Sequence, residues 1–422
     1  MNSVIHRRET CRLCGGTDHE LILSLKPSPI CDAYQVMTND PKEQELFPMD
    51  LFLCKTCGGS QILDVIDPEA LYRDYIYLST SSMGLSDHFR SYASSVYTKL
   101  GLQSSDLIVD IGSNDGTLLD HFKTLGAKVV GVEPAREIAK QAIESGIHTY
   151  PEFFNKSFAN RIREEQGKAK LVTMNNLFAN VDDIDSVVDG ISDLLSSDGV
   201  YVFETFYFLD YVQNLVFDFM YHEHLSYFSV YPLSQYFSKK NMELFDIERV
   251  STKGGSLRCF VQFKNGPYCK TAIVDKMIEN ERKEGLLQDG QLLENFRDRI
   301  RRCGDWLNHR LDQYQKDGKS IVGFGASATT TTFVYHYGLQ DRFEYLVDDN
   351  PAKQHTLSPG CHLRVFPSSI LYENNPDVVV IIAWRYADAI IRANQAFLNS
   401  GGTFIVPLPE PRIISKTDAQ AM

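Results

Sequence analysis

The sequence predicts an α/β protein in which two Rossmann-like domains with parallel sheets follow a small, cysteine-rich N-terminal module. Residues 105–205 and residues 319–409 each alternate short apolar runs with helical patterns. Strand–helix alternation of this kind is typical of a parallel sheet with crossover helices. Residues 1–72 are instead rich in cysteine, proline and turn residues. The length of 422 residues also favours two or three domains, because domains usually span about 100–200 residues.

The composition argues against several classes of partner. The net charge of −13 disfavours a nucleic-acid partner, because phosphate binding needs clustered Lys and Arg. The chain has no run of about 18 apolar residues, so no membrane helix is expected. The N-terminus has no apolar signal core, which favours a cytoplasmic protein with reduced cysteines. The sequence leaves the oligomeric state open and is compatible with a monomer.

Two CxxC pairs in the N-terminal module predict a metal site. The pairs are Cys11 with Cys14 and Cys54 with Cys57, and two glycines follow each pair. Two intervening residues let both sulfurs turn onto one ion, and four thiolates fill the tetrahedral shell that zinc prefers. Such a shell has no open position, so we expect a structural zinc. Four unrelated free cysteines, or a redox pair, are the weaker alternatives.

The first alternating region contains four predicted strands and two predicted helices. The strands lie at 105–112, 127–133, 169–176 and 198–205, and the helices start near residue 116 and span 134–146. A glycine-rich turn joins the first strand to its helix and lets a ligand approach the main chain. The spacing of this turn is GxxxG, which differs from the GxGxxG of dinucleotide-binding folds.

The acidic residues around this turn indicate a cofactor other than a dinucleotide. Asp110 precedes the glycines, where it can position them or contact an amino group of the ligand. Glu133 ends the second strand, where its carboxylate can accept hydrogen bonds from both ribose hydroxyls. This arrangement is similar to that of methyltransferases that bind S-adenosylmethionine; the alternative is a tight turn in an unrelated α/β domain. The predicted cofactor-binding residues are Asp110, Gly112, Ser113, Asn114, Gly116, Glu133, Pro134 and Asn176.

Two polar aromatic segments contain candidate catalytic groups. Residues 221–229 read YHEHLSYFS, in which the histidines lie too close together for the HExxH zinc helix. General acid/base chemistry is the better functional interpretation, because a histidine can take a proton while a neighbouring glutamate orients it. The alternative is a surface loop with buried tyrosines. Residues 75–82 read YIYLSTSS and could equally form a strand edge.

The C-terminal half resembles a second nucleotide-binding unit. Helices are predicted within 271–316, then strands at 319–325, 343–349, 377–384 and 401–409, and residues 412–422 are predicted to be a tail. Gly323 and Gly325 begin a GxGxxA turn, and Asp348 follows about 20 residues later, as in an NAD-binding fingerprint. The helix after the turn could instead hold a diphosphate at its N-terminus.

These motifs together resemble the sugar C-methyltransferase family of deoxysugar biosynthesis. The resemblance covers nearly the whole chain and rests on the paired CxxC, YxYLSxxS, DIGSNDG, YHEHLSYFS, GGSLR, GFGASA, VDDNPAKQ and PLPEP. It implies three domains: a zinc module (1–72), an S-adenosylmethionine-dependent methyltransferase domain (73–268) and a C-terminal Rossmann-like domain (269–422). It also implies that the last domain helps to bind the nucleotide of the substrate and does not bind NAD.

The resemblance further implies a substrate and a mechanism. The substrate would be a nucleotide-linked 4-keto-6-deoxysugar, methylated at C3 through an enolate. His224 would be the base, with Tyr221 and Glu223 beside it, and Tyr75 or Tyr77 would be an active-site tyrosine. The substrate-binding residues would be Ser79, Ser82, His222, Gly325, Ser327, Asp348, Lys353, Arg385 and Tyr386.

The sequence departs from the family pattern at two places. Asn180 replaces the histidine that usually follows Asn-x-x-Ala, and an asparagine can donate a hydrogen bond to an enolate but cannot transfer a proton. Four threonines follow the GASA turn, where a basic residue and glycine are usual. The alternatives are an O- or N-methyltransferase, an NAD-dependent sugar oxidoreductase and a non-catalytic nucleotide-sugar-binding protein.

Overall fold

The computed structural model describes residues 4–72, 84–287 and 290–419. The residues predicted at the active site as Tyr75, Tyr77, Ser79 and Ser82 therefore lie outside the described residues. The chain folds into two compact units. The first unit comprises Met1–Glu20, Leu53–Leu209 and Leu225–Gln288, and the second comprises Leu21–Phe52, Asp210–His224 and Asp289–Met422. Among the described helices, none has both the length and the apolar character needed to cross a membrane.

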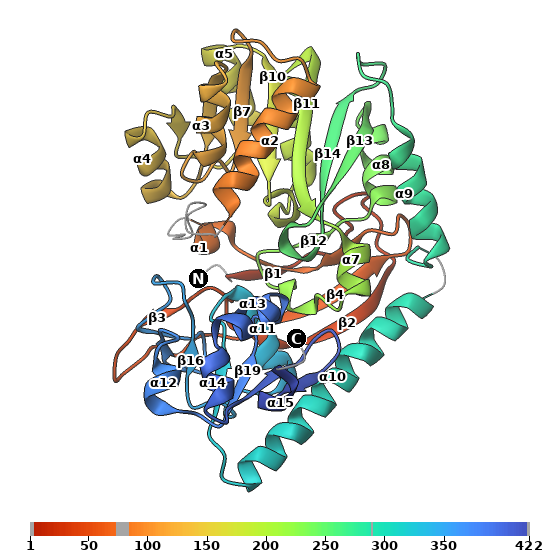
Figure 1. Cartoon of the computed structure of the whole chain (residues 1–422). Coiled ribbons are helices and arrows are strands. Elements are labelled where there is room, and N and C mark those ends of the chain that lie inside the picture. The colour runs from red at the N-terminus through yellow and green to blue at the C-terminus, as the bar shows by residue number, and fades with distance from the viewer. Residues whose placement is uncertain (1–3, 73–83, 288–289, 420–422) are drawn as a thin grey trace. The chain divides into compact units, whose positions relative to one another are not determined.

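The first unit is built on a seven-stranded sheet in the order β13-β14-β11-β10-β7-β8-β9. Figure 1 labels its strands β13, β14, β11, β10 and β7. Five strands run parallel, namely β7 (Leu107–Ile111), β8 (Lys128–Val132), β9 (Thr149–Tyr150), β10 (Ala169–Asn175) and β11 (Leu195–Phe206). The four strands predicted in this region are confirmed. Sequence patterns did not predict the antiparallel pair β13 (Met242–Val250) and β14 (Ser256–Phe263), which extends the sheet beyond β11.

The strand order places a topological switch point between β7 and β10. The chain adds β8 and β9 on one side of β7 and adds β10 and β11 on the other. In open α/β sheets, ligands bind at the carboxyl ends of the strands where the order reverses in this way. The central strands are buried along their length, as the burial of all five residues of β7 shows. Burial on both faces explains why these strands have nearly continuous apolar sequences.

Helices cover the sheet of the first unit. They are α1 (Pro68–Tyr72), α2 (Leu85–Lys99), α3 (Thr117–Thr124), α4 (Arg136–Glu144), α5 (Lys156–Gln166), α6 (Ile184–Leu194), α8 (Val230–Lys239) and α9 (Ala272–Lys283). Helix α2 packs against α3, and α5 packs against α6. Helices α8 and α9 lie beside β13 (Figure 1). Short 3-10 helices η2 (Phe178–Asn180) and η4 (Thr252–Gly254) follow β10 and β13.

The N-terminal segment contributes short antiparallel pairs to the first unit. Strand β1 (Ile5–Arg7) pairs with β6 (Asp64–Ile66), and β5 (Ser60–Ile62) pairs with β12 (Ser226–Tyr227). Strand β4 (Phe47–Cys54) begins in residues of the second unit and ends in residues of the first, and strand β2 (His19–Ser28) begins in the first and ends in the second. Helix α7 (Phe208–Gln213) does the same.

The second unit contains a six-stranded sheet in the order β18-β16-β15-β19-β20-β21. The strands are β15 (Ile321–Phe324), β16 (Leu346–Val347), β18 (Val365–Phe366), β19 (Val378–Ile381), β20 (Thr403–Val406) and β21 (Arg412–Ile414), all parallel except the last. A separate two-stranded ribbon joins β3 (Gln35–Val36) to β17 (Thr356–Leu357). The four strands predicted in this half are confirmed.

The helices of the second unit include the long α10 (Gln291–Lys316), which is visible in Figure 1. The others are α11 (Ala328–Tyr337), α12 (Ile370–Asn374), α13 (Ala387–Ala393), α14 (Gln395–Asn399), α15 (Lys416–Ala419) and the 3-10 helices η3 (Phe217–Phe219) and η5 (Trp384–Tyr386). The prediction of a tail over 412–422 was wrong for its first part. Strand β21 pairs antiparallel with β20, because Ile414 buries its side chain there.

Candidate active site

The four predicted zinc ligands meet in the first unit. Their Sγ atoms all lie within 4.8 Å of one another. Cys11 Sγ lies 3.6 Å from Cys57 Sγ, and Cys14 Sγ lies 3.6 Å from Cys54 Sγ. A tetrahedron with Zn–S bonds of about 2.3 Å has edges of about 3.8 Å, so this cluster fits zinc. Four thiolates leave no position for substrate, and the ion would stabilise the module without reacting.

Each knuckle of the zinc cluster is closed by a glycine in a left-handed conformation. Gly15 has φ +74° and Gly58 has φ +77°. Their amides donate to the carbonyl oxygens of Cys11 at 2.9 Å and of Cys54 at 2.8 Å. Side chains other than glycine rarely adopt this conformation. The glycines that follow each CxxC are thus part of the site's geometry.

The turn between β7 and α3 is shaped by glycines at its two ends. Gly112 has φ +73°, and a Cβ atom there would lie 2.5 Å from Cδ2 of Leu177. Gly116 has φ +81° and is the N-cap of α3. Between them, Asn114 is also left-handed at φ +50°. A turn without side-chain bulk at its ends lets a ligand approach the main chain closely.

Asp110 is a buried carboxyl group at the end of β7. The residue is 4% exposed, and its Oδ1 accepts a hydrogen bond from Thr173 Oγ1 at 2.6 Å. Burial raises the pKa of Asp110 to about 7. A carboxyl group in this condition would gain from a cationic ligand, because a nearby positive charge stabilises the ionised form. The α-amino group of S-adenosylmethionine is such a cation.

Glu133 fastens the glycine-rich turn to the end of β8. Its Oε2 accepts from the amide of Asn114 at 2.9 Å, and its Oε1 accepts from the amide of Ala135 at 2.9 Å. The residue is 7% exposed, and burial raises its pKa. A carboxylate oxygen can accept more than one hydrogen bond. Glu133 can therefore hold the turn and still accept from ribose hydroxyls.

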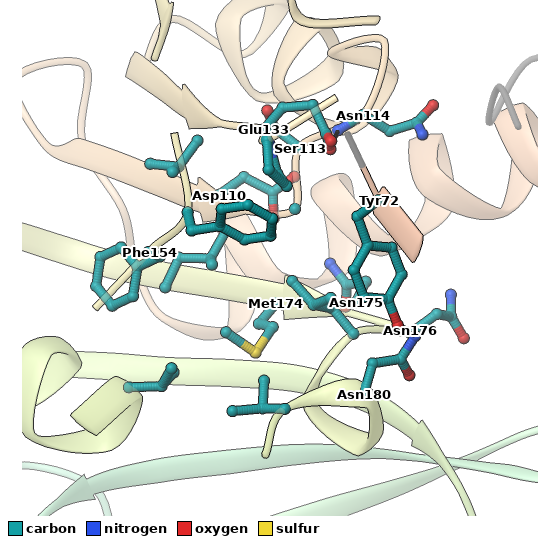
Figure 2. A pocket seen from close by; sticks show the side chains of 18 of the residues that line it. Tyr72, Asp110, Ser113, Asn114, Glu133, Phe154, Met174, Asn175, Asn176 and Asn180 are labelled. Carbon is teal, nitrogen blue, oxygen red and sulfur yellow. Dashed lines mark hydrogen bonds between the residues drawn. The ribbon is translucent and has the colours of Figure 1, made fainter. Parts of the chain in front are cut away.

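A cavity of about 420 Å³ lies at the switch point of this sheet. Figure 2 shows its lining. Seven predicted cofactor residues line it together with Asn180, namely Asp110, Gly112, Ser113, Asn114, Glu133, Pro134 and Asn176. The eighth, Gly116, does not line the cavity but begins α3. The structure thus brings together residues that lie up to 70 positions apart in the sequence.

Sequence reasoning missed several side chains of this cavity. Tyr72, Phe154, Met174 and Lys253 also line it. The side chains of Tyr72 and Asn180 point toward one another in Figure 2, and Asn180 Nδ2 donates to Tyr72 Oη at 3.2 Å. Asn180 Oδ1 is buried and has no hydrogen-bond partner among the described residues. A buried acceptor without a partner is costly, and a ligand donor could satisfy it.

A buried network of charged side chains lies at the carboxyl end of β11, next to the cavity. Glu204, which is 1% exposed, lies at the end of β11. Its carboxylate accepts from Arg258 Nε at 2.8 Å and lies 2.8 Å from His88 Nε2. The amide of Glu204 also donates to Asn175 Oδ1 at 3.1 Å. This network explains the arginine of the GGSLR motif, whereas no sequence pattern paired it with Glu204 or His88.

The first four residues of the predicted acid/base segment, 221–224, end the middle portion of the second unit, and its other residues belong to the first unit. His224 is 5% exposed, and its Nδ1 lies 2.8 Å from the carbonyl oxygen of Phe219. A carbonyl can only accept, so Nδ1 is the donor in this contact and Nε2 is the nitrogen left to exchange a proton. The ring of His224 also lies against Tyr221, with centroids 4.1 Å apart. Glu223 is 8% exposed.

His222 lies two positions before His224 and is buried as well. His222 is 1% exposed, and its Nε2 lies 3.2 Å from the carbonyl oxygen of Phe47. Burial lowers its pKa to about 4. His222 thus packs in the interior of the second unit, and its role in substrate binding stays a prediction. Its Nδ1 is buried without a hydrogen-bond partner among the described residues.

In the second unit, as in the first, a carboxylate accepts a hydrogen bond from a main-chain amide of the glycine-rich turn. Asp348 Oδ2 accepts from the amide of Ala326 at 2.6 Å, as Glu133 accepts from Asn114. Gly325 has φ +121°, and a Cβ atom there would lie 2.9 Å from the amide nitrogen of Ala383. Ser327 forms a capping box with Thr330 at the start of α11.

The threonines after this turn and two predicted basic residues are bound within the second unit. Thr331 Oγ1 donates to the carbonyl oxygen of Cys31 at 2.9 Å. Lys353 Nζ donates to Asp32 Oδ1 at 2.7 Å. Arg385 Nη1 donates to both carboxylate oxygens of Asp218 at 3.0 Å. Tyr386, in contrast, is 66% exposed.

Comparison with known proteins places these features in a family. Three family models match: a zinc binding domain (residues 11–72), a methyltransferase domain (86–246) and a C-methyltransferase C-terminal domain (251–409). The C-methyltransferase NovU of Streptomyces niveus is 31% identical over 416 residues, which cover 98% of this chain and 99% of that protein. The chain belongs to the C-methyltransferase family. It is an S-adenosylmethionine-dependent methyltransferase with a zinc-binding module.

Solved structures give weaker similarities. A magnesium protoporphyrin IX methyltransferase from Synechocystis PCC 6803 is 11% identical, covers 42% of this chain and 82% of its own, and has a TM-score of 0.33. A methyltransferase from Clostridium acetobutylicum is 12% identical, covers 42% of this chain and 92% of its own, and has a TM-score of 0.34.

Proposed function

We propose that the enzyme methylates C3 of a nucleotide-linked 4-keto-6-deoxysugar through an enolate that His224 generates. A saturated carbon has no electron pair to donate until its proton is removed, so methylation of C3 beside the ketone needs a base. The contact between Nδ1 of His224 and the carbonyl oxygen of Phe219, at 2.8 Å, supports this proposal. With Nδ1 as donor to that carbonyl, Nε2 is the nitrogen that would take the proton.

The proposed reaction removes one proton from C3 and adds one methyl group in its place. Nε2 of His224 takes the proton from C3, the C–H electrons form a C3–C4 double bond, and the electrons of the C4 carbonyl pass to its oxygen. The sulfonium donor, when bound, supplies an electrophilic methyl group. C3 then forms a bond to that methyl carbon, the carbon–sulfur bond breaks with its electrons on sulfur, and the C4 ketone is restored. His224 returns its proton to solvent.

The residues of the first-unit cavity would bind the donor. Asp110 would pair with the α-amino group, and Glu133 would accept from the ribose hydroxyls. The main chain of Gly112 and Asn114 would contact the ligand closely, since the turn carries little bulk. These roles follow from the cavity lining and from the pattern of acidic residue, glycine-rich turn and second acidic residue.

Asn180 would stabilise the oxygen on which the negative charge develops. Its segment is tied to the one that follows the proposed base, since the amide of Leu225 donates to the carbonyl oxygen of Ala179 at 2.8 Å. His224 is joined to Leu225 by one peptide bond. An amide N–H can donate to the enolate oxygen but cannot protonate it fully. Proton transfer would then depend on His224, with Tyr221 and Glu223 adjusting its basicity.

The second unit would bind the nucleotide of the substrate, through Gly325, Ser327, Asp348, Lys353, Arg385 and Tyr386. Ser327 lies at the N-terminus of α11, where amides and the helix dipole favour an anion. Lys353 and Arg385 are already paired with aspartates, so a diphosphate would have to compete for them. We therefore assign the larger share of binding to Ser327 and the exposed Tyr386.

Mass spectrometry of the product with a deuterated methyl donor tests this function. The full chain is incubated with S-adenosylmethionine carrying a CD3 group and a panel of nucleotide-linked 4-keto-6-deoxysugars. We expect one sugar to gain the CD3 group at C3, as fragmentation and carbon-13 NMR can establish. Label on oxygen or nitrogen would contradict the enolate. If the protein binds the donor but transfers the CD3 group to none of these sugars, the proposed substrate class is contradicted.

A further inference from the structure

Arg12 is a buried arginine inside the first CxxC pair of the zinc cluster. Its side chain is 1% exposed. Nη1 donates to the carbonyl oxygens of Ile62 at 2.6 Å and Leu225 at 3.3 Å. Nε donates to Oδ1 of Asp182 at 2.9 Å. One guanidinium group thus connects the metal site to segments of the first unit that lie far apart in the sequence.

Two of these segments lead directly to residues with proposed roles in the chemistry. Asp182 lines the cavity and lies two positions after Asn180. Leu225 follows His224, and its amide donates to the carbonyl oxygen of Ala179 at 2.8 Å. The main chain next to Asn180 and the main chain next to His224 are therefore bonded to each other and also to Arg12.

The second CxxC pair provides a comparison within the same molecule. Lys55 occupies in that pair the position that Arg12 occupies in the first. Its side chain is 55% exposed, and its Nζ lies 4.0 Å from Glu20. A zinc knuckle therefore does not need a buried cation at this position. The burial of Arg12 must have another explanation.

Stability alone explains this burial poorly. Removing a guanidinium group from water is costly unless its donors are well paired. Nη2 of Arg12 is buried and has no hydrogen-bond partner in the part of the chain that the structure describes. Buried polar groups that lack partners are rare in folded proteins and call for a specific explanation.

We propose that Arg12 is a positioning residue that couples the zinc cluster to the active site. It fixes Leu225 and Asp182, and through them the main chain that carries His224 and Asn180. The inference rests on the proposed function for the roles of those two residues. Zinc then contributes to catalysis without touching substrate, because the metal fixes the main chain from which Arg12 extends.

Kinetics of matched variants tests the proposal. Arg12→Met removes the charge and four side-chain hydrogen bonds, to Ile62, Leu225, Asp182 and Oε1 of Gln61, whereas Lys55→Met makes the same chemical change in the other knuckle. We expect both to keep one zinc per chain by inductively coupled plasma mass spectrometry. Arg12→Met should lose at least tenfold in kcat, with the KM for the donor within twofold of wild type. Lys55→Met should match wild type, and Arg12→Lys should recover part of kcat.

Hydrogen–deuterium exchange of the full chain tests the positioning without any substrate. In Arg12→Met we expect the amides of 179–183 and 225–227 to exchange at least tenfold faster, while the knuckle amides of Gly15 and Gly58 keep their protection. Because no sugar is added, the exchange result does not depend on whether the proposed substrate is correct.

Two outcomes would overturn the coupling. One is unchanged exchange and unchanged kcat in the zinc-loaded Arg12→Met protein. The other is loss of zinc in Arg12→Met and in Arg12→Lys alike, which would reduce Arg12 to a part of the knuckle's own stability. If Arg12→Met does not fold, the exchange and kcat of Arg12→Lys decide the question.

Discussion

The amide of Asn114 donates to Oε2 of Glu133 at 2.9 Å, which holds the glycine-rich turn to the end of the neighbouring strand. The same carboxylate is the one that we assign to the donor ribose. One side chain would thus shape the turn and also recognise the cofactor. Substitution of Glu133, compared with substitution of an exposed glutamate of the same unit, can distinguish a specific contact with the cofactor from a simple loss of negative charge.

Glu133→Gln should weaken donor binding. It removes the charge and leaves one oxygen to accept, and a hydrogen bond to a charged group contributes about 1.5–3 kcal/mol. We expect the Kd for S-adenosylmethionine to rise by about 10- to 100-fold, measured by isothermal titration calorimetry. Glu137→Gln, on the exposed side of α4, is the control. An unchanged Kd in Glu133→Gln would contradict the assignment.

Asp110 should make the stability of the donor-free protein depend on pH. Its pKa is about 7 in the folded protein and 3.8 ordinarily, so the folded state binds the proton more tightly. The stabilisation is fully present below about pH 3.8 and is lost as the pH rises through about 7. The Tm of Asp110→Asn, relative to wild type, should therefore rise between pH 5.5 and pH 8. A difference in Tm that stays constant across this range would argue against a neutral buried carboxyl.

Cys57→Ser should remove most of the zinc. The hydroxyl is a poor replacement for the thiolate that completes the tetrahedral shell. Wild-type protein should contain one zinc per chain by elemental analysis, and the variant should contain well under half of that with a lower Tm. The exposed Cys269, substituted by serine, is the matched control. Full zinc content in Cys57→Ser would exclude the four-cysteine site.

Glu281→Gln should destabilise the first unit. Glu281 is 0% exposed, and its carboxylate accepts from the amides of Val230 at 2.6 Å and Tyr231 at 2.9 Å at the start of α8. A glutamine offers one acceptor, so one buried amide loses its partner at a cost of about 1–3 kcal/mol. Chemical denaturation should show this loss, whereas Glu279→Gln on the exposed face of α9 should change little. Equal stabilities of the two variants would contradict this role.

Much of the fold could be predicted from the sequence, because its signals are local. The strands next to the Asp110 turn are nearly continuous apolar runs. The spacing within each CxxC pair by itself predicts that two sulfurs bind one metal ion. The antiparallel strands β13 and β14 have no such signal, since their place depends on pairing with β11. Strand β21 was mistaken for a tail because its burial arises only when β20 lies beside it.

The site was predictable where it consists of short motifs and was missed where it depends on tertiary contacts. His222 and His224 look equivalent in the sequence, and only the structure shows that different ring nitrogens contact main-chain carbonyls, Nε2 of His222 at Phe47 and Nδ1 of His224 at Phe219. The pairing of Glu204 with Arg258 joins residues 54 positions apart. Arg12 gives no signal beyond its place in a CxxC pair, because its partners come from distant segments.

The measurement that tests the central claim most directly is exchange of the C3 proton of the sugar with solvent deuterium. Wild-type protein is incubated in D2O with the 4-keto-6-deoxysugar nucleotide and the spent donor, S-adenosylhomocysteine, so that no methyl group can be transferred. We predict incorporation of one deuterium at C3, by proton NMR, and its loss in His224→Gln with donor binding retained. Equal exchange in wild type and His224→Gln, or no exchange in a wild-type protein that methylates the same sugar at C3, would contradict the account.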